Sequence, residues 1–335
     1  MRIDAEIHPP SLGETPALAR KAEEYGFDCV WTSEIKHDPF LQLALAASST
    51  KSVGLGTSVA LAFTKSPTSL AYIAWDLQDL SNGRFILGVG SQVKGHIERR
   101  FGVKWDKPAP KMRETVEALR AVWGSWQNGT KLDFRGEFFR LDLMTPFFSP
   151  DPLTHPRIPV YVAGVNQSMC RAAGEVADGL HVHPLHTVRY LKEVIVPALF
   201  AGLRKRNKKR ADFDVTTSAF AAVGRDEKEI RSVRNHYRGQ IAFYASTRTY
   251  RKVMELHGWG DICERLHELS LREEWKRMAA EVTDDVLDEF VIEGTWGEIG
   301  PALRARYEGL ADRVRLYRPF DGRDEWKSLP EAFKP

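Results

Sequence analysis

Short apolar runs rich in β-branched residues alternate with amphipathic runs along the chain. The apolar runs predict buried parallel strands and the amphipathic runs predict helices that cover them. Strands are predicted over 3–7, 27–33, 53–61, 85–89, 158–163, 179–182, 213–223 and 313–317, and helices over 15–25, 39–50, 67–80, 111–126, 167–177, 188–205, 226 to about 278 and 296–307. This alternation predicts an α/β fold, a closed (β/α)8 TIM barrel with insertions, and a doubly wound open sheet is the alternative.

Two additions interrupt the alternation. Residues 131–141 predict a short hairpin that turns at Gly136, and the stretch from Met144 to Pro159 holds five prolines. Helices and central strands both resist that density of proline. Because the strand and helix alternation resumes, we interpret residues 127–157 as an insertion. With extra helices over 226–290 before the last strand, the prediction is a single barrel domain over residues 1–335.

Composition and charge narrow the class of protein. The 335 residues are 43% hydrophobic and carry a net charge of +3, which excludes a disordered or fibrous chain. Six cations crowd residues 204–210, but the run follows an apolar helix pattern and has no interleaved aromatic residues, which favours a solvated helix end over nucleic-acid binding. Three separated cysteines and the absence of a long apolar stretch lead us to expect a cytoplasmic protein with neither a disulfide nor a membrane segment.

Two glycine-containing turns follow predicted strands and are candidate anion sites. The first contains Gly88, Gly90, Ser91 and Gln92, and the second contains Ala163, Gly164, Val165 and Asn166. Backbone N–H groups in such turns can face a phosphate. The first turn is not a dinucleotide fingerprint, because Val93 stands where the third glycine belongs. An ordinary turn or helix cap explains either one alone, but the pair together favours a phosphorylated cofactor.

Titratable side chains gather at two other predicted strand ends. Glu34, with His37 beyond it, ends the second strand and is a candidate for proton transfer, with a salt-bridged carboxylate as the alternative. His181 and His183 stand two residues apart, with His186 beyond them, so their spacing also fits metal ligation. We predict no metal site and interpret His183 as a contact to a cofactor.

Segments at these positions resemble the luciferase-like monooxygenase superfamily, which contains flavin-dependent and deazaflavin (coenzyme F420) dependent oxidoreductases built on a (β/α)8 barrel. The resemblance extends from Ala17 to Tyr317 and is carried by residues 22–34, 53–59, 83–90, 159–164, 172–179 and 309–314. It implies a bacterial luciferase-like barrel with F420 or FMN as its cofactor.

The segment from Gly56 to Val59 is most similar to the F420-dependent branch. In that branch a bulge in the third strand carries a non-proline cis peptide bond beneath the deazaflavin ring. The resemblance places this bond at Ser58–Val59, with Thr57 beside it, and implies that the turns at 88–92 and 164–166 hold the cofactor's phosphate and tail.

One departure concerns the acid and histidine pair of the F420-dependent sugar-phosphate dehydrogenases. Glu34 matches the acid, but Ile35 stands where the histidine would be, and Gln92 and Val93 stand where a glutamate would follow the glycines. We therefore do not expect the same proton relay, and His37 is a hypothetical substitute.

The prediction is an F420-dependent oxidoreductase that transfers a hydride between the deazaflavin C5 and a small organic substrate. A monooxygenase of the same fold that uses reduced FMN and O2 is the alternative. A metal-dependent barrel hydrolase using His181 and His183, or a non-catalytic F420 carrier, is less favoured. The resemblance also implies a homodimer formed through helices near strands two and three, with no nucleic-acid or membrane partner.

Overall fold

A parallel sheet closes into a barrel at the centre of the molecule. The computed structural model describes residues 1–334. Its strands follow the order β1-β13-β11-β10-β9-β6-β4-β3-β2. Their bounds are β1 Arg2–Ile3, β2 Ala5–Glu6, β3 Cys29–Thr32, β4 Gly54–Thr57, β6 Phe85–Gly90, β9 Val160–Gly164, β10 Gly179–Val182, β11 Asp214–Gly224 and β13 Arg313–Leu316. Because β1 and β2 are one strand interrupted at Asp4, and pair with β13 and β3 respectively, the path ends where it began. The predicted (β/α)8 barrel is confirmed.

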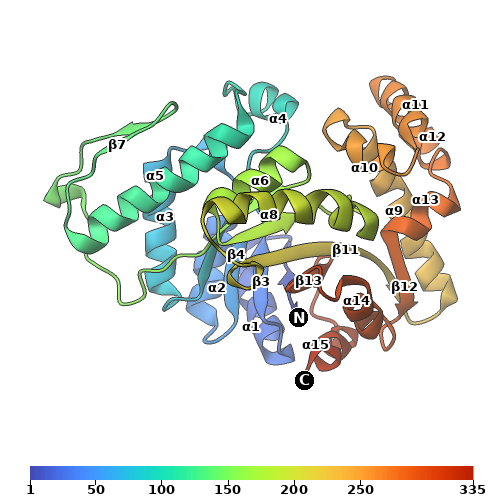
Figure 1. Cartoon of the computed structure of the whole chain (residues 1–335). Helices are drawn as coiled ribbons and strands as arrows, with labels where there is room; N and C mark the ends of the chain where they lie inside the picture. The colour runs from blue at the N-terminus through green and yellow to red at the C-terminus, as the bar shows by residue number, and fades with distance from the viewer. Residues whose placement is uncertain (335) are drawn as a thin grey trace.

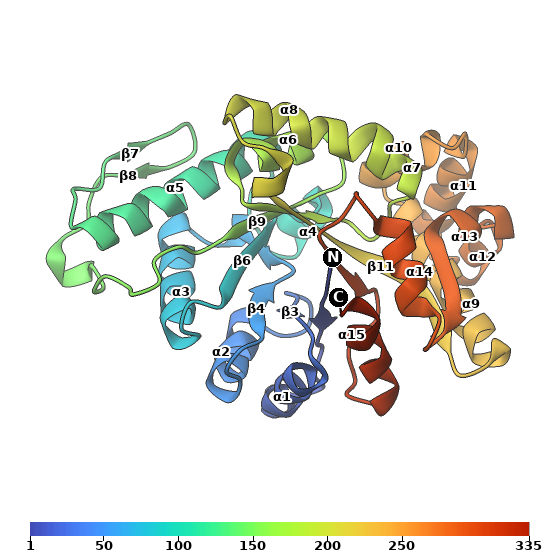
Figure 2. The same ribbon diagram turned by 60° about the horizontal axis from the view of Figure 1, so that its bottom comes forward.

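Helices surround the barrel, as Figures 1 and 2 show. The main ones are α1 Thr15–Tyr25, α2 Pro39–Ser49, α3 Pro67–Leu80, α5 Pro108–Asn128, α6 Gln167–Val176, α8 Val196–Lys205, α9 Glu227–Ala245 and α14 Ile299–Tyr307. Capping side chains and prolines determine where several of these helices begin. Asp38 caps α2 by accepting from the N–H groups of Phe40 and Leu41, and a proline holds the first turn of both α2 and α3.

The two predicted additions lie on opposite sides of the molecule (Figure 1). The hairpin of β7 (Phe134–Arg135) and β8 (Arg140–Leu141) extends beyond α5 and turns near Gly136, as predicted. The region before the last strand holds α9 and the short helices α10 Arg251–Glu255, α11 Gly260–Leu271, α12 Trp275–Ala280 and α13 Asp284–Phe290.

The structure differs from the predicted elements in four places. The third strand is interrupted after Thr57 and resumes as β5 (Ala60–Leu61), which pairs with β6. A strand that was not predicted, β12 (Val291–Thr295), pairs with the second half of β11 from Phe220 to Gly224. The short helices α4 (Lys94–Arg99) and α15 (Ser328–Phe333) were also not predicted.

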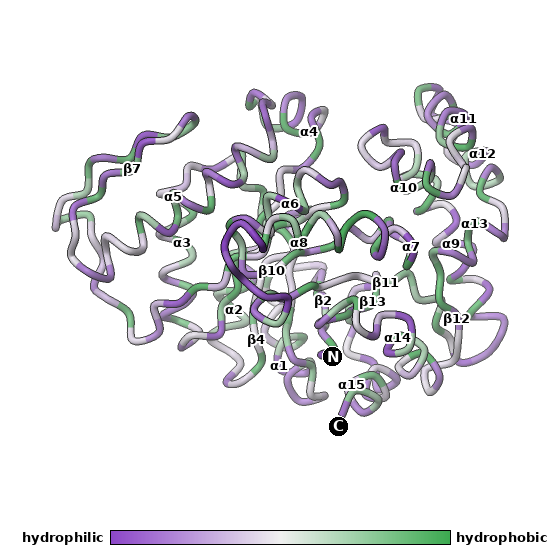
Figure 3. Tube along the Cα trace, viewed as in Figure 1, coloured by the Kyte–Doolittle hydropathy of each residue, from purple (hydrophilic) through white to green (hydrophobic). Residues whose placement is uncertain are grey.

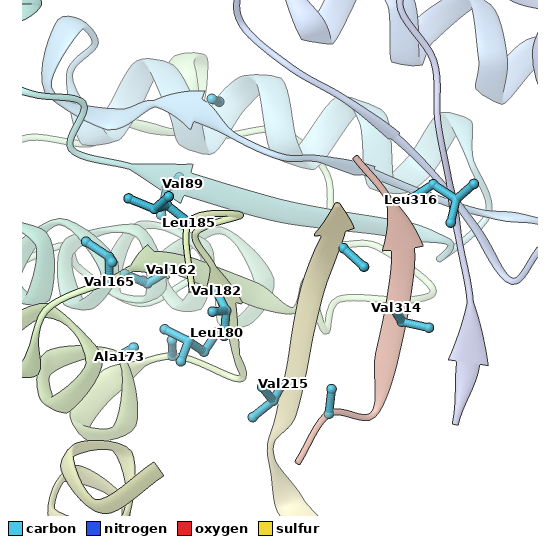
Figure 4. Close-up of a cluster of buried hydrophobic side chains, with 14 of the residues drawn as sticks. Val89, Val162, Val165, Ala173, Leu180, Val182, Leu185, Val215, Val314 and Leu316 are labelled. Carbon is cyan, nitrogen blue, oxygen red and sulfur yellow. The ribbon is translucent and has the colours of Figure 1, made fainter. Parts of the chain in front are cut away.

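Apolar side chains fill the layer between the barrel and its helices. Figure 4 shows Val162, Leu180 and Ala173 together, where β9 and β10 meet α6. In Figure 3 the loop that follows α8 is hydrophilic. The basic residues 204–210 span the end of α8 and this loop, and of these Lys205 pairs with Glu175 at 2.7 Å and Arg210 with Asp312 at 2.7 Å. Because this loop precedes β11, it lies at the amino-terminal ends of the strands.

The barrel interior holds charge as well as apolar groups. The guanidinium of Arg313 donates to both carboxylate oxygens of Asp4, at 2.8 and 2.7 Å, and the Trp31 indole donates to the same carboxylate at 2.9 Å. Gly56 leaves room for Trp31, because a Cβ there would lie 2.3 Å from its ring. No helix among residues 1–334 is long and apolar enough to cross a membrane.

Candidate active site

A cavity of about 650 Å³ opens at the carboxyl-terminal ends of the barrel strands. This volume is within the range that holds small ligands and cofactors in enzymes. Its walls combine apolar groups (Val59, Leu61, Ala163, Val182 and Pro184) with polar groups (Glu6, His8, Ser33, Ser58, Gln92, His181, His183, Ser218 and Arg315). In (β/α)8 barrels the carboxyl-terminal face is where catalysis takes place, so this cavity is the candidate active site.

The side of the cavity formed by the first and last strands is an ionic network. Arg315 Nε donates to Glu6 Oε2 at 2.9 Å, and its Nη2 donates to Ser58 Oγ at 2.5 Å. Burial alone would raise the pKa of Glu6, but Arg315, His8 and Ser33 outweigh it and hold that pKa well below its ordinary range. Glu6 is therefore a carboxylate that balances the charge of Arg315.

Ser33 and His8 extend this network on the Glu6 side. His8 Nε2 donates to Glu6 Oε1 at 3.0 Å. Ser33 Oγ lies 2.5 Å from Glu6 Oε1 and 2.7 Å from the carbonyl oxygen of Ser58. A hydroxyl has one proton to donate, so these two acceptors compete for it. The network thus ties the first strand to the interruption in the third.

The interruption itself is the Ser58–Val59 peptide, which is cis, at the position that the resemblance implied. Ser58 N donates to Thr32 O at 2.7 Å, and Glu34 N donates to Val59 O at 3.3 Å, which fixes both sides of the bulge to the second strand. Gly90 makes space for it, because a Cβ there would lie 2.5 Å from Val59 Cγ2.

Glu34 lines the cavity, and both of its carboxylate oxygens accept hydrogen bonds within the protein. Its carboxylate accepts from Lys65 Nζ at 2.8 and 2.9 Å and from the backbone N–H of Leu61 at 2.8 Å. Only 14% of its side chain is exposed. These contacts fix the chain just after the bulge, which is the role of a positioning residue.

Aromatic side chains form the wall on the side of α9. His183 stacks on Tyr250 with ring centres 4.2 Å apart and meets the edge of Tyr244 at 4.8 Å. The hydroxyl of Tyr244 hydrogen-bonds that of Tyr317 at 2.5 Å. Burial lowers the pKa of His183 to about 3, and its Nδ1 accepts from Leu185 N at 3.1 Å. His183 is therefore neutral near pH 7 with its proton on Nε2.

The histidines of the sixth strand do not converge. Burial lowers the pKa of His181 well below its ordinary value, and the nearby Arg315 adds to that effect. His186 faces away, with Nδ1 2.8 Å from the carbonyl oxygen of His183 and Nε2 3.1 Å from the hydroxyl of Tyr307. Within residues 1–334 no three His, Cys, Asp or Glu side chains are grouped to hold a metal ion.

The residues proposed from sequence divide into two groups. Those that line the cavity are Glu34, Ser58, Val59, Gln92, Ala163 and His183, and those that do not are His37, Thr57, Gly88, Gly90, Ser91, Gly164, Val165 and Asn166. Thr57 and Gly88 lie behind the wall, where Thr57 Oγ1 donates to Gly88 O at 2.6 Å. Asn166 caps α6 by accepting from Met169 N at 3.3 Å. A role in phosphate binding for these turns stays a prediction.

Sequence reasoning missed Glu6, Ser218 and Arg315. A usable signal was present, because Asp4 and Glu6 in the first strand match Arg313 and Arg315 in the last with the same two-residue spacing. Alternate residues of a strand point to the same face, so two acids and two bases on strands that meet in a closed barrel predict interior ion pairs.

The family model described as luciferase-like monooxygenase matches residues 1–313. An uncharacterised protein of Mycobacterium tuberculosis is 46% identical over 314 residues, which cover 94% of this chain and 92% of that protein. The 5,10-methylenetetrahydromethanopterin reductase of Archaeoglobus fulgidus is 30% identical over 323 residues, with 94% and 92% covered.

Among solved structures, the coenzyme F420 dependent tetrahydromethanopterin reductase of Methanopyrus kandleri superposes with a TM-score of 0.80. The alignment covers 99% of this chain and 97% of that one at 19% sequence identity. The similarity at this identity is one of fold.

Proposed function

Since the chain belongs to the luciferase-like monooxygenase family and is thus an oxidoreductase, we propose that it uses F420 to transfer a hydride to or from a small organic substrate. The observation that carries this proposal is the cavity at the carboxyl-terminal face, bordered by the Ser58–Val59 bulge. The sequence relationship to a methylenetetrahydromethanopterin reductase supports the deazaflavin over the flavin, because a solved tetrahydromethanopterin reductase is described as coenzyme F420 dependent.

The residues present fit a planar heterocycle with polar edges. Val59, Leu61 and Ala163 offer apolar surface for a ring face, and Gln92 and Ser58 offer polar groups near it. Arg315 Nη1 is buried and has no hydrogen-bond partner in the protein, so the site still has a donor to satisfy. When bound, the deazaflavin supplies the hydride chemistry, and the protein supplies orientation and exclusion of water.

In this proposal Ser58 and Val59 form the ring seat, and other residues hold that seat in place. Arg315 fixes Ser58 through the hydroxyl, and Glu34 fixes the following residues through Leu61 N and Lys65. Gly90 leaves Val59 its space. The turns at 88–92 and 164–166 are proposed for the phosphate and the tail, and His183 for a contact at the neutral aromatic wall.

Proton transfer by Glu34 and His37 was the prediction from sequence. Glu34 lines the cavity, and its two oxygens already accept from Lys65 and Leu61, which supports a positioning role. His37 is not among the lining residues. We therefore propose that Glu34 positions the Ser58–Val59 bulge, and we assign no role to His37.

A fluorescence titration of the purified protein with F420 and with FMN tests the cofactor. We expect a micromolar or tighter dissociation constant for F420, at least about tenfold below that for FMN. The opposite preference would support the second candidate, a monooxygenase using reduced FMN and O2, which the family description favours. Binding of neither cofactor would contradict both. Loss of F420 absorbance on adding a substrate would exclude a carrier role.

We also propose that the protein acts as a homodimer through α2 and α3. Leu41 and Leu45 on α2 are 56% and 38% exposed, and Leu80 at the end of α3 is 49% exposed. Light scattering on the wild type and on a Leu41→Glu variant tests this, because a charge placed in an apolar contact would shift a dimer towards monomer.

A further inference from the structure

Ser218 and Arg315 both line the cavity, and each has a buried polar atom without a hydrogen-bond partner in the protein. Ser218 on β11 and Arg315 on β13 are register partners. They are 1% and 6% exposed, and neither Ser218 Oγ nor Arg315 Nη1 has a hydrogen-bond partner. A buried polar atom left unpaired costs on the order of 1–3 kcal/mol, so native structures rarely keep one without a ligand or water to pair with it.

We propose that Ser218 and Arg315 form a substrate subsite that binds the carbonyl oxygen of an uncharged substrate, a proposal that rests on the proposed function. Arg315 Nη1 can only donate, and the Ser218 hydroxyl can donate as well. Donors that converge from neighbouring strands select an acceptor atom. An oxygen with two lone pairs satisfies both, whereas an ammonium group has no lone pair and would face the guanidinium with its own charge and N–H groups.

The ionic network selects an uncharged ligand over a carboxylate. Arg315 already pairs with Glu6 through Nε at 2.9 Å, so the charge of the guanidinium is balanced within the protein. A second carboxylate at Nη1 would bring an unbalanced negative charge into the buried end of the cavity, close to Glu6. Burying an unpaired charge costs several kcal/mol, whereas a carbonyl oxygen carries no such penalty.

The subsite borders the proposed ring seat. The same guanidinium that offers Nη1 to the substrate donates through Nη2 to Ser58 Oγ at 2.5 Å. A carbonyl held at Nη1 is therefore next to the residue that shapes the seat. His181 also lines the cavity, and neither of its ring nitrogens has a hydrogen-bond partner. Its Nε2 faces the wall, 2.7 Å from the position of a Cβ on Gly88, and we assign the subsite to the register pair Ser218 and Arg315.

The chain contains a matched control for this subsite. Thr216 is on the same strand, two residues before Ser218, and its hydroxyl is also buried and unpartnered. Unlike Ser218, it does not line the cavity. Ser218→Ala and Thr216→Val each remove one buried hydroxyl that makes no hydrogen bond within the protein. Both variants should fold, and only the first changes the cavity.

The test compares cyclohexanone with methylenecyclohexane, which has nearly the same shape but no acceptor oxygen. Dissociation constants are measured by ligand-observed NMR on the full chain, with and without F420. We expect the ketone to bind the wild type and Thr216→Val at least about tenfold more tightly than the alkene. In Ser218→Ala this preference should fall to about threefold or less, as expected for one hydrogen bond, while the F420 dissociation constant stays unchanged.

Several results would overturn the proposal. These are equal binding of ketone and alkene to the wild type, no binding of the ketone, or an unchanged preference in Ser218→Ala. A weaker F420 affinity in Ser218→Ala would assign the hydroxyl to the cofactor and overturn it as well. Failure of the proposed function would look different: the wild type would not bind F420, and yet would keep its preference for the ketone.

Discussion

Arg315 donates from Nε to Glu6 Oε2 at 2.9 Å, which joins the last strand of the barrel to the first at the edge of the cavity. The side chains of both residues are about nine-tenths buried, with 7% of Arg315 and 11% of Glu6 exposed. The pair therefore has two roles. It joins the first and last strands of the barrel, and through the hydrogen bond from Arg315 to Ser58 it holds the wall of the candidate active site.

Breaking this pair should destabilise the protein strongly. Arg315→Met leaves the Glu6 carboxylate buried without its counter-charge, and we expect a loss of about 3–5 kcal/mol in the free energy of unfolding, measured with urea. The double variant Glu6→Gln with Arg315→Met should recover much of that loss. The surface pair Lys107–Glu137 is the control, because Lys107→Met should leave the urea midpoint unchanged. A loss below about 1 kcal/mol in the single variant would contradict the prediction.

Much of the fold was predictable, because short stretches of sequence indicate each strand and helix of the barrel. Buried parallel strands give apolar runs, and caps such as Asp38 with the following Pro39 mark helix starts. β12 was missed for a physical reason. Its Glu293 and Gly294 break the apolar run, and it forms by pairing with the end of β11, a contact that no local pattern shows.

Gly56→Ala should destabilise the protein by about 1–3 kcal/mol, because the new methyl would overlap the buried Trp31 ring, 2.3 Å from its nearest atom. Gly124 in α5 is the matched control, since nothing lies within 4 Å of a Cβ there. Gly124→Ala should be neutral or stabilise by up to about 1 kcal/mol, because alanine has the higher helix propensity. Thermal unfolding of both variants measures the contrast, and equal shifts would refute it.

The candidate site was less predictable than the fold. Strand ends in the sequence pointed to Glu34 and His183, and the family resemblance pointed to Ser58, and all three line the cavity. Ser218 could not be found from sequence, because its interest lies in a buried hydroxyl without a partner, which only the folded packing shows, whereas Arg315 had a signal in its matched spacing with Glu6. Packing also explains why residue 88 is a glycine, since a Cβ there would lie 1.9 Å from Thr57 O.

Glu23 should make stability depend on pH in the acid range. Its Oε1 accepts from the N–H groups of Lys51, Ser52 and Val53, at 2.8, 2.6 and 3.0 Å. Burial would raise the pKa of Glu23, but these hydrogen bonds lower it from 4.5 to about 2. The unfolded chain therefore binds the proton first, and the stability that Glu23 contributes is present above pH 4.5 and is lost as the pH falls towards 2.

The variant Glu23→Gln isolates this contribution. Because the side chain is partly open to solvent, we expect it to contribute about 1–2 kcal/mol at pH 6 and little at pH 2. Urea unfolding at pH 6, 4 and 3 should show the wild type and Glu23→Gln converging as the pH falls. Glu24 is on the exposed side of the same helix, so the free energy of unfolding of Glu24→Gln should change with pH in the same way as that of the wild type. A constant gap between the wild type and Glu23→Gln would contradict the assignment.

Gly90→Ala tests the proposed ring seat without removing any polar group. Its methyl would lie 2.5 Å from Val59 Cγ2, so Val59 must move from the place where it lines the cavity. We expect the dissociation constant for F420 to rise about tenfold, because a ring packed on a displaced wall loses contact area. Gly95→Ala is the control, since nothing lies within 4 Å of its Cβ. A fluorescence titration that gives the same F420 affinity for Gly90→Ala, Gly95→Ala and the wild type would place the ring away from Val59.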